Sequence, residues 1–445
     1  MVNKVLTQKN IFQKELANRR KHVLQAAGVD SIVCLFAAEQ RNYSNDVDHR
    51  YRQDSNFYYL NGNAEDKMIM VLAAGHSLGD YILFCTPNDE HTALWEGARI
   101  GVDRAKRAFG ADKIFPMDAF SEVFTQLIDG RKNLYCDTLD GNRFSQLVDL
   151  CGQAYWNQRG HTIPNHYIDI RTLLGRLRLK KSRLEIEGIQ QSVDISVGAH
   201  RRAMQMCRPQ LYEYQIDAEI MRVFNQHNAR AAYPSIVAGG ANACVLHYTN
   251  NQSRLKAGSL LLIDAGAEYQ MYASDITRTI PVSKRFKSHQ RELYEVVLEA
   301  QLQAIAKVKV GNSWCDVNNV AAHSLSRGLI DIGLLKGPLS ALIKRAAYRD
   351  FYMHGIGHWL GLDVHDTTDA NKDKSGKLRR FEAGMVLTIE PGLYIANRLD
   401  IAKHFRNTGI RIEDDVLVTN QKPKVLSQHL VKEVDDIEAV MAASG

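Results

Sequence analysis

The chain has 445 residues, of which 45% are hydrophobic and 24% are charged. A single core stops growing at roughly 250–300 residues, so we expect two or three domains. The 56 basic and 50 acidic residues leave a net charge of only +6, and the basic pairs are scattered, so no nucleic-acid partner is expected. The longest apolar runs, such as Met68 to Ala74, fall far short of the roughly 20 residues that cross a bilayer, so no membrane span is expected.

The cysteines and the N-terminal sequence indicate the cellular compartment of the protein. The seven cysteines are odd in number, widely spaced and never in a CxxC pair, which suits buried thiols in a reducing compartment. The N-terminus carries Lys4, Lys9 and Lys14 without the apolar core of a secretory signal. We therefore expect a soluble, cytoplasmic protein.

The first part of the chain, residues 1–178, is predicted to form an α/β domain because strand and helix patterns alternate there. Ser182 to Glu185 then reads as a capping box, which marks the start of a helix and of a second domain, residues 182–445. The expected strands of the first domain are Ile32 to Phe36, Met68 to Ala73, Tyr81 to Phe84 and Leu134 to Cys136. A helix is expected at Ala119 to Leu127, between the last two strands.

The second domain is predicted to be α+β. After the helix that starts at Ser182, the apolar pattern indicates helices at Tyr212 to Gln226, Gln290 to Val308 and Trp314 to Ile332. Strand-like stretches that end on acidic residues lie between and after them. We therefore expect helices to lie outside a set of strands that carry the acids.

Two of these acids belong to neighbouring strands. The apolar run Leu260 to Ile263 ends on Asp264, and Asp275 opens a stretch in which Thr277 and Thr279 follow with the two-residue period of a strand. If the two strands pair as a hairpin, both carboxylates face one pocket. Two carboxylates in a low-dielectric site repel each other, so either one takes up a proton or a cation lies between them.

Further candidate ligands follow downstream. The strand pattern of Met385 to Gly392 ends with Glu390 at a Pro-Gly turn, and Gly409 to Asp415 places Arg411 and Glu413 on one face. Between the first pair of acids, Asp264 and Asp275, and this second pair, Glu390 and Glu413, the segment His354 to His365 contains three histidines. The His354 and His358 spacing resembles an HExxH zinc helix, but glycines interrupt it and no Glu follows His354, so that interpretation fails.

The ordered set of these acids and His358, with the strings HGIGHWLGLDVHD, TIEPGLY and GIRIEDD, resembles the pita-bread metallopeptidases. Trp359 and the VHD behind it resemble the aminopeptidase P branch most, and Tyr51 to Leu60 and Leu94 to Gly97 resemble the N-terminal domain of that branch. The resemblance implies a C-terminal pita-bread fold behind an N-terminal α/β domain. It implies that the metal ligands are Asp264, Asp275, His358, Glu390 and Glu413.

Five ligands are too many for one open catalytic ion, but they suit two ions about 3.5 Å apart that share carboxylates and a water molecule. The resemblance implies that Asp275 and Glu413 bridge, that Asp264 completes one ion, and that His358 and Glu390 complete the other. Oxygen ligands predominate, which favours two Mn²⁺ per subunit, with Co²⁺, Fe²⁺ or Zn²⁺ as alternatives. A hydroxide bridged by the two ions is expected to attack the scissile carbonyl.

The resemblance also implies roles around the metals. His247 and His354 would flank a pocket for a penultimate proline, and His365 would donate a hydrogen bond to the substrate carbonyl or oxyanion. Arg411 would orient Glu413, and Glu390 would also carry a proton to the leaving nitrogen. Tyr394 and Trp95 are further expected substrate contacts. The polar stretch Asp366 to Arg380 is predicted to be a loop at the mouth of the site.

Together these features predict a metallo-aminopeptidase that removes an N-terminal residue when the second residue is proline. The alternative is a prolidase that acts on Xaa-Pro dipeptides, because the motifs do not encode substrate length. A non-catalytic pita-bread binding protein is disfavoured because all five ligands are present. The expected partners are peptides with a penultimate proline and further copies of the chain, as a dimer or tetramer.

Overall fold

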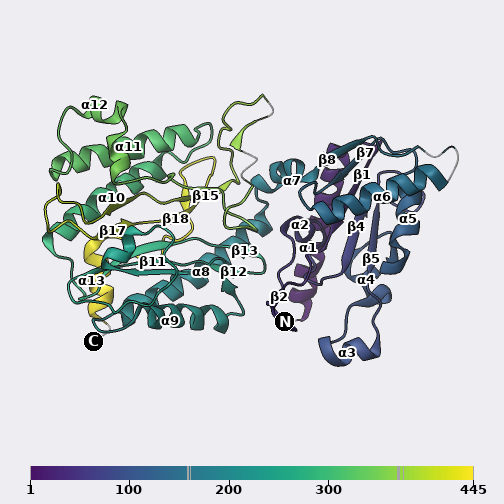
Figure 1. Cartoon of the computed structure of the whole chain (residues 1–445), viewed down its shortest axis with the longest axis horizontal. Helices are drawn as coiled ribbons and strands as arrows, with labels where there is room; N and C mark the ends of the chain where they lie inside the picture. The colour runs from purple at the N-terminus through teal and green to yellow at the C-terminus, as the bar shows by residue number, and fades with distance from the viewer. Residues whose placement is uncertain (1, 158–159, 161, 368–370, 374, 444–445) are drawn as a thin grey trace. The chain divides into compact units, whose positions relative to one another are not determined.

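The computed structural model describes residues 2–157, 160, 162–367, 371–373 and 375–443. The chain divides into two compact units, Met1–Leu177 and Arg178–Gly445. Figure 1 shows the first unit in purple and blue and the second in teal, green and yellow. None of the helices in the described part of the chain combines the length and the hydropathy of a membrane-spanning segment.

The N-terminal unit is built on a six-stranded mixed sheet with the order β6-β5-β4-β1-β7-β8. Strand β1 pairs antiparallel with β4 and parallel with β7. All four strands predicted here are confirmed, with small shifts at their ends. The strands of the sheet are β1 Ser31–Phe36, β4 Met68–Leu72, β5 Tyr81–Cys85, β6 Lys113–Pro116, β7 Asn133–Cys136 and β8 His166–Asp169, and the small hairpin is β2 Asn42–Ser44 and β3 Val47–Asp48.

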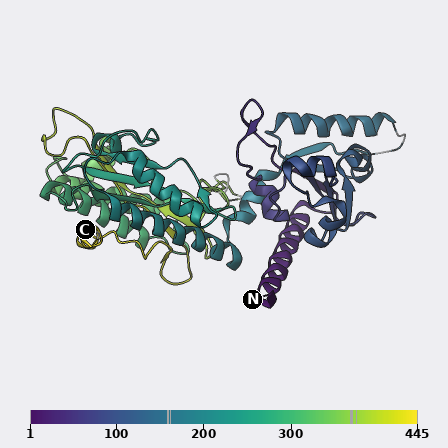
Figure 2. The same cartoon turned by 90° about the horizontal axis from the view of Figure 1, so that it is seen from below.

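Helices cover both faces of this sheet, which explains why its central strands are continuous apolar runs. On one face, Phe120 and Phe124 of α5 join Leu147 of α6 in a buried cluster with alternate strand residues. On the other face, α1 packs against α2 and β1. Figure 2 shows α1 as a long helix that begins at the N-terminus of the chain. The helices are α1 Val2–Ala27, α2 Ser55–Asn61, α3 Glu90–Glu96, α4 Gly101–Phe109, α5 Phe120–Leu127, α6 Gly141–Asn157 and α7 Ile170–Leu179. Helix α7 was not predicted from the sequence.

The C-terminal unit begins with α8 at the predicted capping box. The Ser182 hydroxyl accepts a hydrogen bond from the Glu185 backbone N–H, and the Glu185 carboxylate accepts one from the Ser182 N–H, which confirms that prediction. Helix α8 packs against α9 and against β12 and β13, and α10 packs against α11. The helices are α8 Arg183–Met206, α9 Glu213–Gln226, α10 Ser288–Ala306, α11 Trp314–Asp331, α12 Leu339–Lys344 and α13 Val434–Ala442.

Short antiparallel strands carry the acidic residues. Strand β11 pairs with β14 in a register that places Asp264 opposite Thr277, so the predicted hairpin is present. It is interrupted by β12 and β13, because the connection folds back on itself before β14 begins. The strands are β9 Arg230–Ala231, β10 Ile236–Gly239, β11 Leu260–Asp264, β12 Ala267–Tyr269, β13 Tyr272–Ala273, β14 Thr277–Pro281, β15 Val386–Ile389, β16 Gly392–Ile395, β17 Thr408–Arg411, β18 Asp414–Leu417 and β19 Lys424–Val425.

Two details of the sequence-based prediction need correction. Asp275 was expected inside a strand, but β14 starts at Thr277, so Asp275 lies in the connection that leads into it. Gly409 to Asp415 was expected to be one strand with Arg411 and Glu413 on one face, but β17 ends at Arg411 and β18 begins at Asp414, so Glu413 lies in the break between them. Glu390 follows directly after β15, at the strand tip where it was expected. In the predicted loop 366–380, residues 368–370 and 374 lie outside the described part of the chain. Within the rest, Lys372 forms an isolated bridge with Leu378.

Candidate active site

A cavity of about 470 Å³ in the C-terminal unit gathers the residues singled out from the sequence. The acids reach it from the points where strands end or are about to begin. Pro234, Ile236, Leu246 and Val364 supply apolar lining. The predicted residues that line this cavity are Asp264, Asp275, His358, Glu390, Glu413, His247, His354, His365 and Arg411.

Asp264 and Asp275 share one hydroxyl. The Tyr233 hydroxyl oxygen lies 2.6 Å from Oδ1 of Asp264 and 2.5 Å from Oδ1 of Asp275. The turn that brings the two acids together depends on Gly266, where a Cβ would lie only 1.8 Å from the Ser274 carbonyl oxygen. Burial and then the charges of Asp264 and Asp275 raise the pKa of Tyr233 well above its usual range, so it stays a hydrogen-bond donor.

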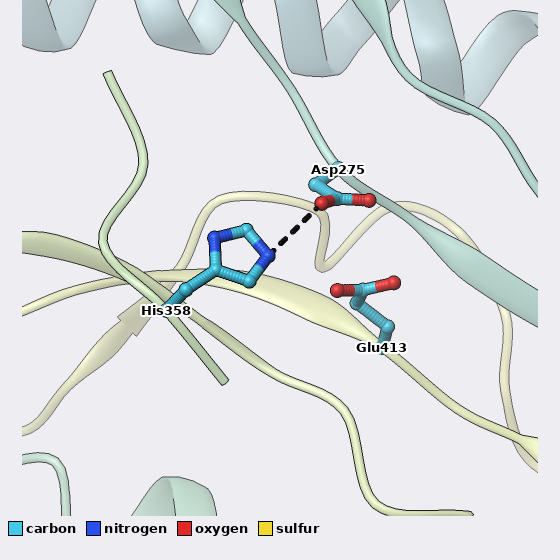
Figure 3. Close-up of side chains that lie close together, drawn as sticks. All are labelled: Asp275, His358 and Glu413. Atoms are coloured by element: carbon cyan, nitrogen blue, oxygen red, sulfur yellow. Dashed lines mark ion pairs between the residues drawn. The ribbon is translucent and has the colours of Figure 1, made fainter. Parts of the chain in front are cut away.

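Asp275, His358 and Glu413 form the tightest group of possible ligands. Donor atoms from the three residues all lie within 4.8 Å of one another. Figure 3 shows the His358 ring directed at the Asp275 carboxylate, with Glu413 beside both. The distance from Nε2 of His358 to Oδ2 of Asp275 is 3.2 Å, while Nδ1 lies 3.0 Å from the Trp359 carbonyl oxygen. The Thr277 hydroxyl donates to Oε2 of Glu413 at 2.6 Å.

A buried chain of hydrogen bonds connects Asp264 to His354 through Arg411. The Arg411 guanidinium donates to Oδ2 of Asp264 at 2.5 Å and to the Tyr394 hydroxyl at 2.9 Å. The Tyr394 oxygen lies 2.8 Å from Nε2 of His354. Nδ1 of His354 lies 2.8 Å from the Gly355 carbonyl oxygen, so this nitrogen carries the proton and Tyr394 donates to the other. Burial and then the Arg411 charge lower the pKa of His354 to about 4.

The carboxylates in this cavity disfavour one another's charge. Burial and the charges of Asp275 and Glu390 raise the pKa of Glu413 well above its usual range. Burial also raises the pKa of Glu390, although His358 and Arg411 oppose the rise. For His358, burial alone would lower the pKa, but the hydrogen bond and charge of Asp275 raise it to about 9. A group of acids in this state binds a cation favourably, because the cation removes the repulsion.

His365 lies against the same group from a neighbouring segment. Its ring centroid is 4.3 Å from that of His358, edge to face. The next residue, Asp366, is almost completely buried and forms ion pairs with Arg178 and Lys181, the second at 3.0 Å. The Asp366 N–H also donates to the Trp359 carbonyl at 2.9 Å. His365 therefore extends from a fixed segment rather than from a free loop.

A second buried ion pair, between Arg278 and Asp414, lies next to Glu413 in the chain and holds its backbone. Arg278 is fully buried, and its guanidinium donates to the Glu413 carbonyl at 2.6 Å and to Oδ1 of Asp414 at 2.7 Å. It also donates to the carbonyls of Val431 at 3.0 Å and Leu430 at 3.1 Å. This arginine thereby connects the strand after Asp275, the backbone at Glu413 and the C-terminal segment.

The donor set fits divalent metal ions. Four carboxylates and one imidazole face one cavity, and hydrogen bonds from Tyr233, Thr277 and Arg411 orient three of the carboxylates. Such outer partners commonly fix the ligands of protein metal sites. The arrangement can therefore hold a metal and a peptide carbonyl together, which is the requirement for metal-assisted hydrolysis.

Two predicted residues lie apart from the cavity lining. Tyr394 is buried behind His354 and contacts it directly. Trp95 belongs to α3 of the other unit and is 78% exposed, so its role in substrate binding stays a prediction. Tyr233 was not predicted from the sequence, because it has no motif of its own and reaches the acids only through the tertiary fold. The two-residue alternation of Asp275, Thr277 and Thr279 could have identified Thr277, which donates to Glu413.

Comparisons with known proteins agree with this geometry. The model of metallopeptidase family M24 matches residues 187–420, and that of the aminopeptidase P N-terminal domain matches residues 16–135. A Xaa-Pro aminopeptidase of Haemophilus influenzae is 39% identical over 96% of this chain and 97% of its own. Among solved structures, the aminopeptidase PepP of Pseudomonas aeruginosa has a TM-score of 0.94 and 41% identity over 97% of this chain and 98% of its own. An Escherichia coli aminopeptidase P variant solved with substrate has a TM-score of 0.93 and 36% identity over 97% of this chain and 98% of its own.

These matches span both units, which confirms the family resemblance and the pita-bread fold predicted from the sequence. The chain therefore belongs to metallopeptidase family M24, within its aminopeptidase P members.

Proposed function

We propose that this chain is a metallo-aminopeptidase that hydrolyses the bond between the N-terminal residue and a penultimate proline of a peptide. The observation that carries the proposal is the single cavity that gathers five oxygen and nitrogen ligands and three further histidines. The full-length similarity to proteins named Xaa-Pro aminopeptidase supports the same reaction.

The proposed ligands are Asp264, Asp275, His358, Glu390 and Glu413, with Asp275 and Glu413 between two ions. Divalent ions would acidify a water molecule and polarise the scissile carbonyl. We propose Mn²⁺ because carboxylate oxygens predominate, with Co²⁺, Fe²⁺ or Zn²⁺ as alternatives. Three of the carboxylates contact neutral hydroxyls, Asp264 and Asp275 that of Tyr233 and Glu413 that of Thr277, and each hydroxyl leaves the carboxylate's charge available to the metals.

The residues around the ligands are proposed to hold the peptide. His365, beside His358, would donate a hydrogen bond to the substrate carbonyl as charge develops on its oxygen. His247 and His354 would flank the proline ring. Arg411 and Tyr394 would hold His354 in one tautomer, since Tyr394 donates to its Nε2. Glu390, with Oε2 3.7 Å from Nδ1 of His354, would pass a proton to the leaving proline nitrogen.

The remaining expectations about the chain are proposals of the same kind. We propose that residues 1–178 and 182–445 are its two domains and that Trp95 contacts the peptide. A homo-oligomer and a cytoplasmic location are also proposed. The location is supported by the seven cysteines, all in the described part of the chain, which are free, five of them buried.

Three matched peptides and the metal-loaded chain test the reaction. The peptides are Xaa-Pro-Yaa-Zaa, the same peptide with alanine in place of proline, and the dipeptide Xaa-Pro, with products identified by mass spectrometry. We expect release of the first residue from the proline peptide only, and loss of that activity with a chelator. Cleavage of the dipeptide alone would identify a prolidase, and cleavage of none of the three with bound metal would contradict the proposal.

A further inference from the structure

One buried acid outside the proposed ligand set, Glu213, accepts hydrogen bonds from four groups in and beside the segment that carries His247. This segment, residues 240–252, is called the His247 loop below. It follows strand β10, starts as a short 3₁₀ turn at Gly240–Cys244, and has no helix or strand beyond that turn. His247 and Leu246 of this loop line the cavity, yet the His247 side chain is exposed and its own backbone lies in a turn. Something else must hold the loop in position.

The fixed point is the carboxylate of Glu213, in the first turn of α9 (Figure 1) and 0% exposed. Its Oε1 accepts hydrogen bonds from the Gly239 N–H at 2.7 Å and from Nδ2 of Asn242 at 2.9 Å. Its Oε2 accepts from the Tyr248 hydroxyl at 2.8 Å and from the Ser253 N–H at 2.8 Å. The four donors are two backbone groups and two neutral side chains.

These donors are distributed around the whole loop. Gly239 and Ser253 directly flank the loop, and Asn242 and Tyr248 lie within it on either side of His247. The Ser253 carbonyl also accepts from the Glu213 N–H at 3.0 Å, so the acid and the loop end hold each other. One side chain therefore closes the loop at its base and holds both of its arms.

The approach of the loop to this acid is close. At Gly239, a Cβ would lie 3.2 Å from Oε1 of Glu213 and 3.0 Å from Leu255, which is tighter than most contacts of a Cβ atom. A second contact fixes the loop end to β10, since Oδ1 of Asn251 accepts from the Val237 N–H at 3.0 Å. A buried carboxylate with this many donors is stable only in this one arrangement, because any donor that leaves uncovers a buried charge.

We infer that Glu213 is a positioning residue that sets His247 over the metal-binding acids by holding the His247 loop. The inference rests on the proposed function of His247, but it concerns a residue outside the cavity that touches neither substrate nor metal. The Glu213 carboxylate accepts from four donors in and beside this loop. A residue that only capped α9 would need a single capping contact.

The change Glu213→Gln tests this directly. An amide keeps one acceptor oxygen and turns the other into an N–H donor, so two of the four donors lose their partner whichever way the amide faces. A displacement of about 1 Å in a substrate-positioning group can lower the rate about 100-fold, so we expect kcat/KM to fall roughly 10–100-fold. Metal content should stay that of the wild type. Tyr248→Phe removes one donor and should produce a smaller loss.

A matched control is Glu185→Gln. Glu185 is also a buried acid in a first helical turn, but it contributes to the capping box of α8 rather than to the loop, and glutamine serves in such a box. We expect this variant to keep wild-type kcat/KM. If both variants lose the same activity, Glu213 acts only through general stability and the inference is wrong.

A double-mutant cycle with His247→Ala separates this inference from the proposed function. If Glu213 acts through His247, the double variant should have the kcat/KM of His247→Ala, within about a factor of three, because the group being positioned is already gone. If the two losses multiply, Glu213 does not act through His247 and the positioning role is refuted. If His247→Ala itself has no effect on an active enzyme, the proposed role of His247 fails instead, together with the inference that depends on it.

Discussion

Gly357 offers a sharp test of how the site is built, because it precedes the proposed ligand His358. A Cβ at Gly357 would lie 2.0 Å from the Thr388 carbonyl oxygen, whereas ordinary contact begins at 3.4 Å. The segment around His358 and strand β15 would therefore separate by about 1.4 Å in Gly357→Ala, since packed backbones cannot overlap. Metal sites tolerate ligand displacements of only about 0.2 Å, so we expect loss of the ion that His358 holds.

The energetic cost follows from the bonds between these two segments. The Thr388 N–H donates to the His358 carbonyl at 2.9 Å, the His358 N–H donates to the Thr388 hydroxyl at 3.1 Å, and the Glu390 N–H donates to the Ile356 carbonyl at 2.9 Å. At about 1 kcal/mol each, with a similar penalty for overpacking, Gly357→Ala should lower the free energy of unfolding by roughly 2–5 kcal/mol. The melting temperature should fall by roughly 5–15 °C.

Gly355→Ala is the matched control, because a Cβ at Gly355 would meet nothing within 4 Å. Each variant should be purified and compared with the wild type by thermal melting, by metal analysis and by cleavage of a Xaa-Pro peptide. We expect Gly355→Ala to behave as the wild type. Wild-type metal content and activity in Gly357→Ala would refute the reasoning, and so would equal losses in the two variants.

Three further predictions concern single side chains. His200 is fully buried and donates from Nε2 to a backbone carbonyl at 2.9 Å, and burial lowers its pKa to about 4. Below about pH 6.5 this histidine is therefore protonated in the unfolded chain but stays neutral in the native state. The free energy of unfolding of metal-free protein should for this reason fall by up to about 3 kcal/mol between pH 6.5 and 4. Urea titrations across that range should show that His200→Asn lacks this contribution. Arg278→Met leaves the buried Asp414 without its arginine partner and should lower the free energy of unfolding by roughly 3–5 kcal/mol. The exposed control Arg327→Met should change the free energy of unfolding by less than about 1 kcal/mol, and equal effects of the two variants would contradict this prediction. His365→Ala should lower kcat by roughly 100-fold or more with little change in KM in steady-state kinetics, and a loss confined to KM would assign His365 to substrate binding.

Much of the fold follows from local sequence. The strands of the N-terminal sheet are apolar runs bounded by turn residues, and the capping box at Ser182 marks α8 because both of its bonds form within four residues. The apolar runs also place Asp264 and Glu390 correctly at strand ends, whereas the break in the strand at Glu413 has no local signal. Local pattern does not reveal α7, Ile170–Leu179, because alternating basic and apolar residues resemble a connecting segment as much as a helix.

The parts of the site that sequence could not supply depend on distant contacts. Tyr233 reaches Asp275 across 42 positions in the chain, and Arg278 reaches Asp414 across 136. Neither pair has a local spacing that predicts it, because only the paired sheets bring these residues together. Glu213 is a similar case: in the sequence it is one more acid in a first helical turn, and its four donors are recognised only when the loop is folded over it.

Five side chains of one cavity are proposed to hold two metal ions. The most direct test is to titrate the metal-free chain with Mn²⁺ by calorimetry and to count the bound ions after desalting. We expect about two ions per chain for the wild type and fewer for Glu413→Gln, whose proposed bridging carboxylate is replaced by an amide. Retention of two ions in Glu413→Gln, or no bound ion in the wild type, would contradict this proposal.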